Sequence, residues 1–179
     1  MSPFSENIVF FDTEFTSLDP YKGEILSVGL VRLNGEELYL ELECDAEPSD
    51  WVKDHILPTL NRPKVSREEA GKQIIEFVGK NQPYMVAFAN DFDALYTYKL
   101  LGIDNSPFHW LPIDFASILF AMGIDPESYF DKDDAFNVGE LIKELGVDTS
   151  KHHIHNALDD ARILREVYLK ITEKYSDNG

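Results

Sequence analysis

An apolar segment near the start of the chain leads directly into two acids. Residues 8–15 read IVFFDTEF, a run of β-branched and aromatic residues that predicts a buried strand. Because strand side chains alternate between faces, Asp12 and Glu14 share a face with Phe10. Neighbouring carboxylates at a buried strand end repel each other unless a cation compensates, and hard cations such as Mg²⁺ or Mn²⁺ prefer oxygen ligands. The alternative is a strand whose last two acids simply lie in solvent.

The rest of the chain alternates between strand and helix patterns. The Asn34–Gly35 pair predicts a hairpin turn, so that the first three strands pair as antiparallel hairpins. Later strands alternate with helices and are expected to add in parallel, which gives an α/β fold with a mixed central sheet flanked by helices. We expect further strands at 24–33, 36–43 and 84–89. Helices are expected after Ser49 and over 67–80, 91–101, 114–122, 138–145 and 157–174. Ser66 and Glu69 are expected to cap the helix over 67–80, and Gly102 and Gly146 to be left-handed helix ends.

Composition limits the classes of protein that the chain can belong to. Its 179 residues predict a single domain, residues 1–179, with a core over about 7–174. One cysteine, Cys44, excludes a disulfide framework, and no signal-peptide pattern opens the chain, so we expect a cytoplasmic protein. The longest apolar run, FASILFAMGI, is about half the ~20 residues of a membrane span, so no membrane partner is expected. A net charge of −17 excludes a broad basic face for nucleic acid, but it leaves room for a small metal-lined pocket.

A second group of acids stands where a strand meets a helix, in FANDFDALYTYKLLG. Loops beyond strand ends in α/β sheets often carry functional side chains, which makes Asp93 a candidate. Helical periodicity does not choose between Asp91 and Asp93. The alternative is that one of these acids, or Asn90, only caps the helix, and we prefer that interpretation for Asp91.

The third candidate is the segment HIHNALDDARILREVYLKI. Asp160 shares a helix face with Leu164 and Val167 and so points along the apolar stripe, whereas Asp159 lies on a more polar face and can pair with Arg162. His155 precedes Asp160 by five residues, close enough to reach the same cavity. Two further histidines, His152 and His153, are expected to be structural or exposed.

Together these motifs resemble the DEDDh 3′→5′ exonucleases, a branch of the ribonuclease H-like fold that includes proofreading exonucleases, ribonuclease T and oligoribonuclease. The motif FFDTEFT supplies Asp12 and Glu14, the strand-to-helix FD supplies Asp93, and HNALDDA supplies His155 and Asp160. The likeness runs from residue 7 to about residue 171. Asn90 departs from the pattern, because it stands three residues before Asp93 where many relatives place an asparagine four residues before.

A closer resemblance is to small bacterial exoribonucleases of this family that carry Trp-Val and Leu-Pro after the third strand. The matching segment here is WVKDHILPTL. The same segment also fits an amphipathic helix packed on a core, and this is the interpretation that we weigh more heavily for its apolar residues, namely Trp51, Val52, Ile56 and Leu60.

The resemblance implies a two-metal hydrolysis that releases nucleoside 5′-monophosphates from a 3′ end. Two Mg²⁺ or Mn²⁺ ions would be held with Asp12 as the bridging ligand, Glu14 and Asp160 on the nucleophile side and Asp93 on the other ion. An imidazole, with its ordinary pKa of about 6.5, suits His155 to accept the proton of the attacking water. Relatives contact the terminal nucleotide after the first motif. We therefore expect substrate contacts at Phe15, Thr16, Leu18, Asn90 and Trp51, with a place as the last core residue of its strand as the alternative for Phe15.

The expected substrate is single-stranded RNA or a 3′ overhang, and RNA is preferred through the closer family likeness alone. A DNA-directed exonuclease would use the same five residues. A non-catalytic nucleic-acid-binding or scaffolding module is the alternative from another class, although such a module has no physical reason to keep four converging carboxylates. A homodimer is expected only by analogy with relatives.

Overall fold

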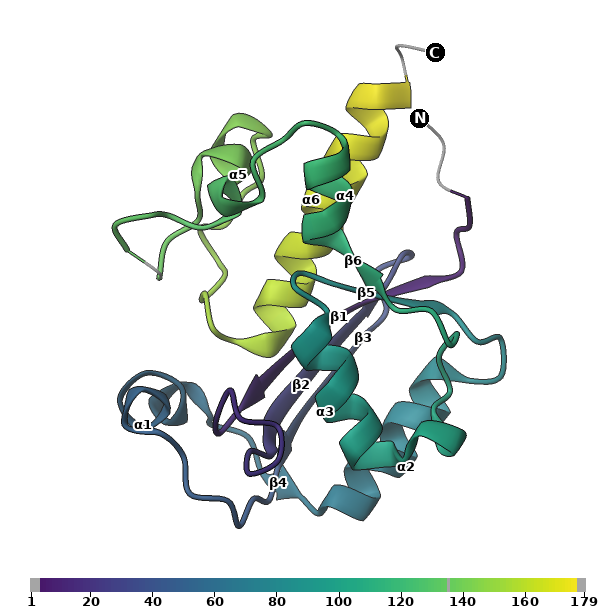
Figure 1. Ribbon diagram of the computed structural model, residues 1–179, viewed down its shortest axis with the longest axis vertical. Coiled ribbons are helices and arrows are strands. Elements are labelled where there is room, and N and C mark those ends of the chain that lie inside the picture. Colours follow the sequence, from purple (N-terminus) through teal and green to yellow (C-terminus); the bar gives the residue numbers. More distant parts are fainter. Residues whose placement is uncertain (1–3, 135, 177–179) are drawn as a thin grey trace.

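A computed structural model describes residues 4–134 and 136–176, which fold around a six-stranded sheet of order β4-β3-β2-β1-β5-β6 (Figure 1). The first three strands pair antiparallel and the remaining pairs are parallel, which confirms the predicted mixed sheet. The two-residue strands β4 and β6 were not expected, because two residues carry no alternating pattern. The strands are β1 (Ile8–Phe15), β2 (Ile25–Arg32), β3 (Glu37–Leu42), β4 (Lys64–Val65), β5 (Tyr84–Ala87) and β6 (Ile113–Asp114).

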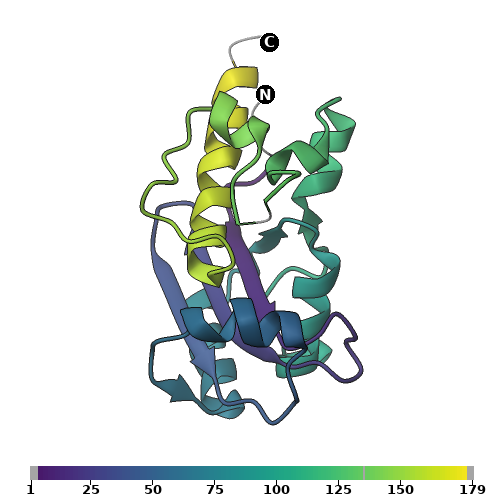
Figure 2. The same cartoon turned by 90° about the vertical axis from the view of Figure 1, so that its left-hand side faces the viewer.

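Helices cover both faces of the sheet (Figures 1 and 2). On one face α2 (Arg67–Val78) and α3 (Asp91–Leu101) pack against Val9 and Phe11 of β1. The opposite face carries Ile8 and Phe10 under the other main helices, so the alternation predicted for β1 is confirmed. Those helices are α4 (Phe115–Ala121), α5 (Glu140–Glu144) and α6 (Ala157–Ser176); the remaining elements are α1 (Asp50–His55) and the 3₁₀ turns η1 (Leu57–Thr59), η2 (Ile103–Asn105) and η3 (Pro126–Tyr129).

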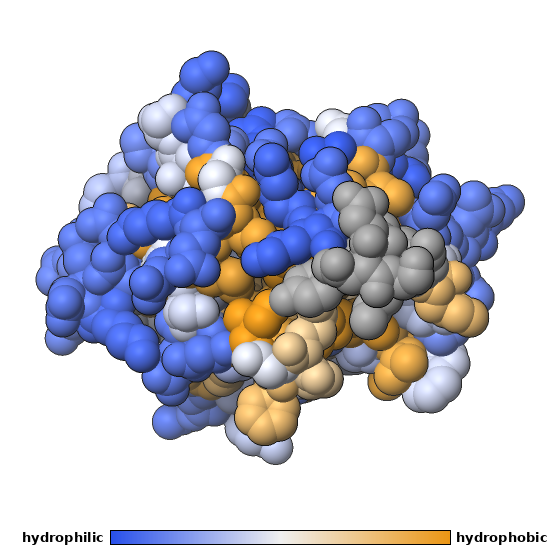
Figure 3. Space-filling model, turned by 90° about the horizontal axis from the view of Figure 1, so that it is seen from above, coloured by the Kyte–Doolittle hydropathy of each residue, from blue (hydrophilic) through white to orange (hydrophobic). Residues whose placement is uncertain are grey.

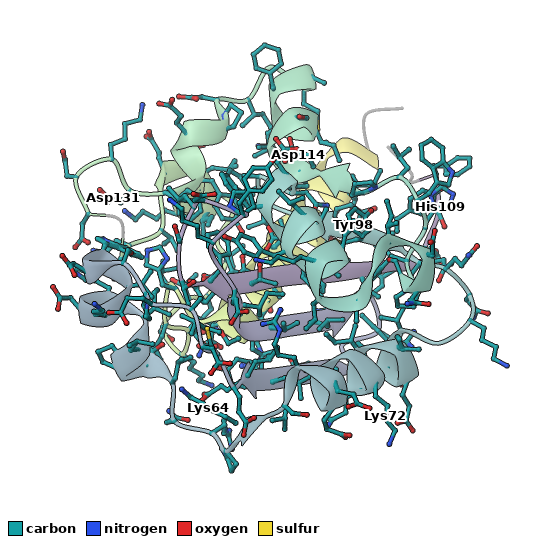
Figure 4. The ribbon with its side chains drawn as sticks, turned by 60° about the horizontal axis from the view of Figure 1, so that its bottom comes forward. Lys64, Lys72, Tyr98, His109, Asp114 and Asp131 are labelled. Atoms are coloured by element: carbon teal, nitrogen blue, oxygen red, sulfur yellow. The ribbon has the colours of Figure 1, made fainter. Side chains whose placement is uncertain are left out.

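The predicted helix ends are mostly confirmed. Ser49 Oγ accepts from the N–H of Val52 at 3.3 Å, and Ser66 Oγ accepts from the N–H of Glu69 at 3.2 Å. The Glu69 carboxylate accepts instead from Gln73 Nε2 at 2.8 Å, so only half of the capping box is used as such. The residues after α3 and α5 include Gly102 (φ 78°) and Gly146 (φ 65°), both left-handed as expected. Asp114, labelled in Figure 4, caps α4 by accepting from the N–H of Ser117 at 3.0 Å.

Gly29 lets α6 begin directly against the sheet. It pairs with Asp12 in the β1–β2 register, and a Cβ built on it would lie 2.2 Å from the carbonyl oxygen of Ala157. Any side chain at this position would therefore collide with backbone. The close approach brings the first turn of α6 beside the end of β1 that carries the two acids.

The surface is largely polar. Seen from above, hydrophilic residues dominate, with an apolar strip between them (Figure 3). In the part of the chain that the structure describes, no helix combines the length and the apolar character that a bilayer crossing requires.

Candidate active site

The acids of β1 meet three other segments at one cavity. Asp12 and Glu14 line it from the end of β1, Asp93 from α3, His155 from the loop before α6, and Asp160 from the first turn of α6. The cavity has a volume of about 470 Å³. In Figure 2, α1 crosses in front of the end of β1, and the start of α6 lies above it. The structure thus brings together all five residues expected to be catalytic, from positions up to 148 apart, 12 to 160, in the chain.

Three of these side chains form a compact group that can hold a metal ion. One ligand atom from each of Glu14, His155 and Asp160 lies within 4.8 Å of the others. The backbone N–H of His155 donates to Asp160 Oδ2 at 2.8 Å. His155 has a left-handed backbone with φ 65°, a conformation that non-glycine residues rarely adopt. The loop therefore bends sharply at His155, and this bend sets the ring beside the acids.

Asp93 is the most deeply placed of the four acids, with 5% of its surface exposed. Its Oδ1 accepts both the backbone N–H of Thr13 at 2.8 Å and the Thr13 hydroxyl at 2.7 Å. Thr13 stands between Asp12 and Glu14 and points to the opposite face of β1. Asp93 is accordingly tied to the strand that carries the other two acids.

Burial raises the pKa of every acid in this group, and the charges of neighbouring acids add to the rise for Asp12, Glu14 and Asp160. The pKa values of Asp12 and Glu14 lie well above their usual range, through burial first and then through the charges of neighbouring acids that include Asp160 and Asp93. Burial raises the pKa of Asp93 to about 7 against the hydrogen bonds from Thr13, and that of Asp160 to about 8 against the bond from His155. Buried carboxylates this close to one another can all ionise only when positive charge compensates their lost hydration and their repulsion. This donor set fits oxygen-seeking divalent cations.

Three of the expected substrate contacts line the cavity. Phe15 stacks on Tyr96 with ring centroids 4.6 Å apart, so it belongs both to the strand's packing and to the cavity wall. Leu18 is 68% exposed and Trp51 is 45% exposed, and the Trp51 ring meets the His155 ring edge-on at 5.2 Å. Of the apolar residues of the α1 segment, Val52 and Ile56 are buried as core, as predicted.

The other two expected contacts lie outside the cavity lining. Thr16 is fully buried, and its Oγ1 accepts from the N–H of Glu24 at 3.0 Å. Asn90 is 2% exposed, and its Nδ2 donates to the carbonyls of Met85 at 3.1 Å and Ile113 at 2.9 Å. The structure thus gives both side chains a place inside the fold, where Asn90 joins β5 to β6. Asn90 makes no side-chain cap to α3 either, so the capping alternative is wrong for this residue.

Several aromatic residues of the site were not anticipated. Tyr129 is buried and stacks on Phe88 with centroids 4.3 Å apart, and burial followed by the charges of Asp160 and Asp12 raises its pKa well above the usual value. Phe130 also lines the cavity, and the Phe136 ring lies 5.1 Å from that of His155. Tyr129 ends the short 3₁₀ turn η3, and Phe130 and Phe136 lie outside the helices and strands, so no periodic pattern indicates which way these side chains point.

The sequence match to a known family decides the classification. A sequence model of the family described as exonuclease (RNase_T) matches residues 9–168. The chain belongs to this exonuclease family. The predicted resemblance to 3′→5′ exonucleases of the DEDD group is thereby confirmed at the level of the family, a family of phosphodiester hydrolases.

Curated relatives of this exonuclease include components of DNA polymerase III. The chain is 28% identical over 182 residues to the epsilon subunit of Rickettsia felis, with 92% of this chain and 73% of that protein covered. It is 24% identical over 179 residues to the PolC-type polymerase of Thermotoga maritima, with 96% of this chain covered but only 12% of the polymerase. The chain therefore spans a small part of the larger relative.

Solved structures confirm the ribonuclease H-like exonuclease fold. The complex of E. coli exonuclease I with single-stranded DNA, in a zinc-bound form, aligns with a TM-score of 0.68 at 14% identity and covers 94% of this chain and 40% of that one. The S. pombe Pop2p structure with Mg²⁺ and Mn²⁺ aligns with a TM-score of 0.63 at 14% identity and covers 97% and 85%.

Proposed function

We propose that this protein is a metal-dependent 3′→5′ exonuclease that removes nucleoside 5′-monophosphates from single-stranded ends. The observation that carries the proposal is the convergence of four carboxylates and His155 on one cavity. Burial raises the pKa of each acid, and the charges of neighbouring acids raise the pKa of Asp12, Glu14 and Asp160 further. Such a cluster stores repulsion that binding of divalent cations relieves.

Asp12, Glu14, Asp93 and Asp160 are the residues that would hold two Mg²⁺ or Mn²⁺ ions. When bound, such ions supply positive charge to the phosphodiester oxygens and acidify water at neutral pH. The Thr13 hydrogen bonds orient Asp93 for this role, and the His155 N–H orients Asp160. The protein thus fixes two of the four ligands before any cation arrives.

His155 is the proposed general base. Its ring offers an atom within 4.8 Å of one carboxylate oxygen of Glu14 and one of Asp160, the two acids that would hold the ion on the nucleophile side. A neutral imidazole takes up a proton near pH 7, and a base within hydrogen-bond reach typically contributes about 10²–10⁴ in rate. The edge-on contacts of the Trp51 and Phe136 rings limit the positions open to the imidazole.

The cavity favours an unpaired terminal nucleotide. Its volume of about 470 Å³ and its aromatic walls, with Phe15 and Phe92 on α3's side and Trp51 on α1, suit a base that has left its stack. Stacking on such rings is tolerant of sequence and is worth roughly 1–3 kcal/mol per base. The net charge of −17 favours short substrates, because a longer strand would meet repulsion beyond the cavity.

RNA is the proposed substrate through the likeness to small exoribonucleases. DNA is the second candidate, because the relatives named above are DNA polymerase III proteins and an exonuclease I bound to single-stranded DNA. Among the described residues that line the cavity, none is assigned to the 2′ hydroxyl, which is the group that separates the two sugars.

The deciding experiment follows the products of 5′-labelled RNA and DNA oligomers of matched sequence over time, with Mg²⁺ or Mn²⁺. A ladder that shortens from the 3′ end, with 5′-monophosphates released, supports the proposal, and the faster substrate identifies the sugar. Asp12→Asn should abolish the ladder, while Asp50→Asn, at an exposed acid of α1, should leave it unchanged. Intact oligomers under all conditions would favour the non-catalytic module.

A further inference from the structure

Asp159 is adjacent to Asp160 in sequence but does not line the cavity. Its side chain is nearly enclosed, with 7% of the residue exposed. Oδ2 accepts from the backbone N–H of His153 at 2.9 Å, and Oδ1 lies 3.1 Å from His152 Nδ1. The Asp159 carboxylate therefore binds the loop that precedes His155. His152 was expected to be structural or exposed, and its contact with Asp159 is structural.

Asp159 is itself anchored to the sheet. Arg162 Nη1 donates to Asp159 Oδ1 at 2.8 Å, and the same guanidinium donates to Glu37 of β3 through Nε at 2.8 Å and Nη2 at 2.5 Å. Burial acts to raise the pKa of Asp159, but the hydrogen bonds from His153, His152 and Arg162 outweigh it, and the pKa lies below its usual value. Donors thus hold both carboxylate oxygens of Asp159 in place.

In the loop that Asp159 binds, His155 has an unfavourable backbone conformation. The N–H of Asn156 donates to the carbonyl of His153 at 3.0 Å, and between them His155 takes φ 65°. This conformation is unfavourable for a non-glycine residue, which keeps it only where the surroundings hold it. Asp159 holds the N–H of His153, two residues before His155, and Asp160 holds the N–H of His155 itself.

We propose that Asp159 is a positioning residue, which acts on the reaction by holding the loop from His152 to His155 so that the His155 ring faces Glu14 and Asp160. Arg162 and Glu37 serve as its anchor to β3. This inference rests on the proposed function, since it assigns the positioned ring the role of base. Asp159 acts on the reaction only through the loop that carries His155, because it lies outside the cavity lining.

The kinetic test is a double-mutant cycle. Asp159→Asn keeps the shape but removes the charge, and it should lower kcat at least tenfold with KM and the Mn²⁺ dissociation constant unchanged within twofold. In a His155→Ala background the same substitution should lower kcat less than twofold, because residues acting through one group are not additive. Glu173→Gln, at an exposed position near the end of α6, is the matched control and should change nothing.

A second readout needs neither metal nor activity. Amide hydrogen exchange in the metal-free protein should become at least tenfold faster at His153 and His155 in Asp159→Asn, while α2 stays protected. Unchanged exchange with unchanged kcat would overturn the inference, and so would an equal loss of kcat with and without His155. If the parent protein cleaves no oligonucleotide, the proposed function fails, whereas the exchange result still decides whether Asp159 holds the loop.

Discussion

Asp93 Oδ1 accepts two hydrogen bonds from Thr13, one from its backbone N–H at 2.8 Å and one from its hydroxyl at 2.7 Å. The two residues are 80 positions apart and join α3 to the strand that carries Asp12 and Glu14. Thr13 reaches α3 from the face opposite to that of its neighbours. One strand thus supplies two acids of the site directly and orients a third.

Thr13→Val should weaken cation binding. Valine keeps the β-branched shape of a strand residue but leaves Asp93 with the backbone bond alone. Hydrogen bonds to charged groups are worth about 1.5–3 kcal/mol, so the Mn²⁺ dissociation constant should rise by at least tenfold in isothermal titration calorimetry. Thr97→Val, which removes another buried hydroxyl from α3, should leave the constant unchanged. Equal constants in all three proteins would show that the Thr13 hydroxyl does not support the site.

His155→Ala should lower kcat on an oligonucleotide by about 10²–10⁴, because removing a positioned general base has this effect. Cation binding should be largely retained, since the four carboxylates remain. Single-turnover cleavage of a 5′-labelled oligonucleotide measures the first quantity and Mn²⁺ titration the second. Cleavage at the parental rate would remove His155 from the mechanism.

The metal-free protein should lose stability as the pH rises from about 5.5 to 8.5. In the folded state the pKa is about 7 for Asp93 and about 8 for Asp160, both above the usual carboxyl value of about 4. Between the unfolded-state and folded-state pKa values of these two acids, the folded state binds more protons than the unfolded state. The free energy of unfolding therefore declines as the pH rises through this range. The melting temperature of the parent protein, measured in chelator, should therefore fall as the pH rises. In the double variant Asp93→Asn/Asp160→Asn the melting temperature should fall less steeply with pH.

Saturating Mn²⁺ should oppose this trend, because cations bind the ionised acids and stabilise the folded state by mass action. The gain in melting temperature over chelator should therefore be largest at the highest pH. A melting temperature that rises with pH in chelator would contradict the assigned directions of the pKa shifts.

The faces of three of the acids, Asp12, Glu14 and Asp160, could be predicted from local sequence. The two-residue alternation of β1 placed Asp12 and Glu14 together, and the helical repeat separated Asp160 from Asp159. The structure bears out both. Long, strongly patterned elements carry this information within a few residues.

Contacts between distant segments could not be predicted in the same way. Thr16 and Asn90 were expected at the substrate, yet the structure encloses both. Thr16 bonds to Glu24, just before β2, and Asn90 joins β5 to β6. Tyr129 reaches the site from the short 3₁₀ turn η3, and the role of Gly29 depends on a helix 128 residues further along, at Ala157. Such relationships depend on tertiary packing, which single-sequence patterns do not encode.

Gly29→Ala should impair both stability and activity. The added Cβ would stand 2.2 Å from the carbonyl oxygen of Ala157 and 2.4 Å from the N of Leu158, so backbone must move. Overpacking of this kind costs typically about 1–3 kcal/mol, and the movement displaces the turn that carries Asp160. We expect a lower melting temperature and a kcat at least tenfold below the parent at a temperature where both are folded.

The matched control is Gly71→Ala in α2, where the added Cβ meets only the flexible Leu101 side chain at 3.2 Å. This variant should keep the parental kcat. If Gly29→Ala also keeps it, the approach of α6 to β2 does not set the geometry of the site.

Diffraction at the manganese absorption edge, from crystals soaked in Mn²⁺ and a nucleoside 5′-monophosphate, tests the central claim most directly. The account predicts two anomalous peaks roughly 4 Å apart, enclosed by the carboxylates of Asp12, Glu14, Asp93 and Asp160, with the His155 ring at their edge. No peak among these four side chains at saturating Mn²⁺, or peaks only elsewhere on the protein, would contradict it.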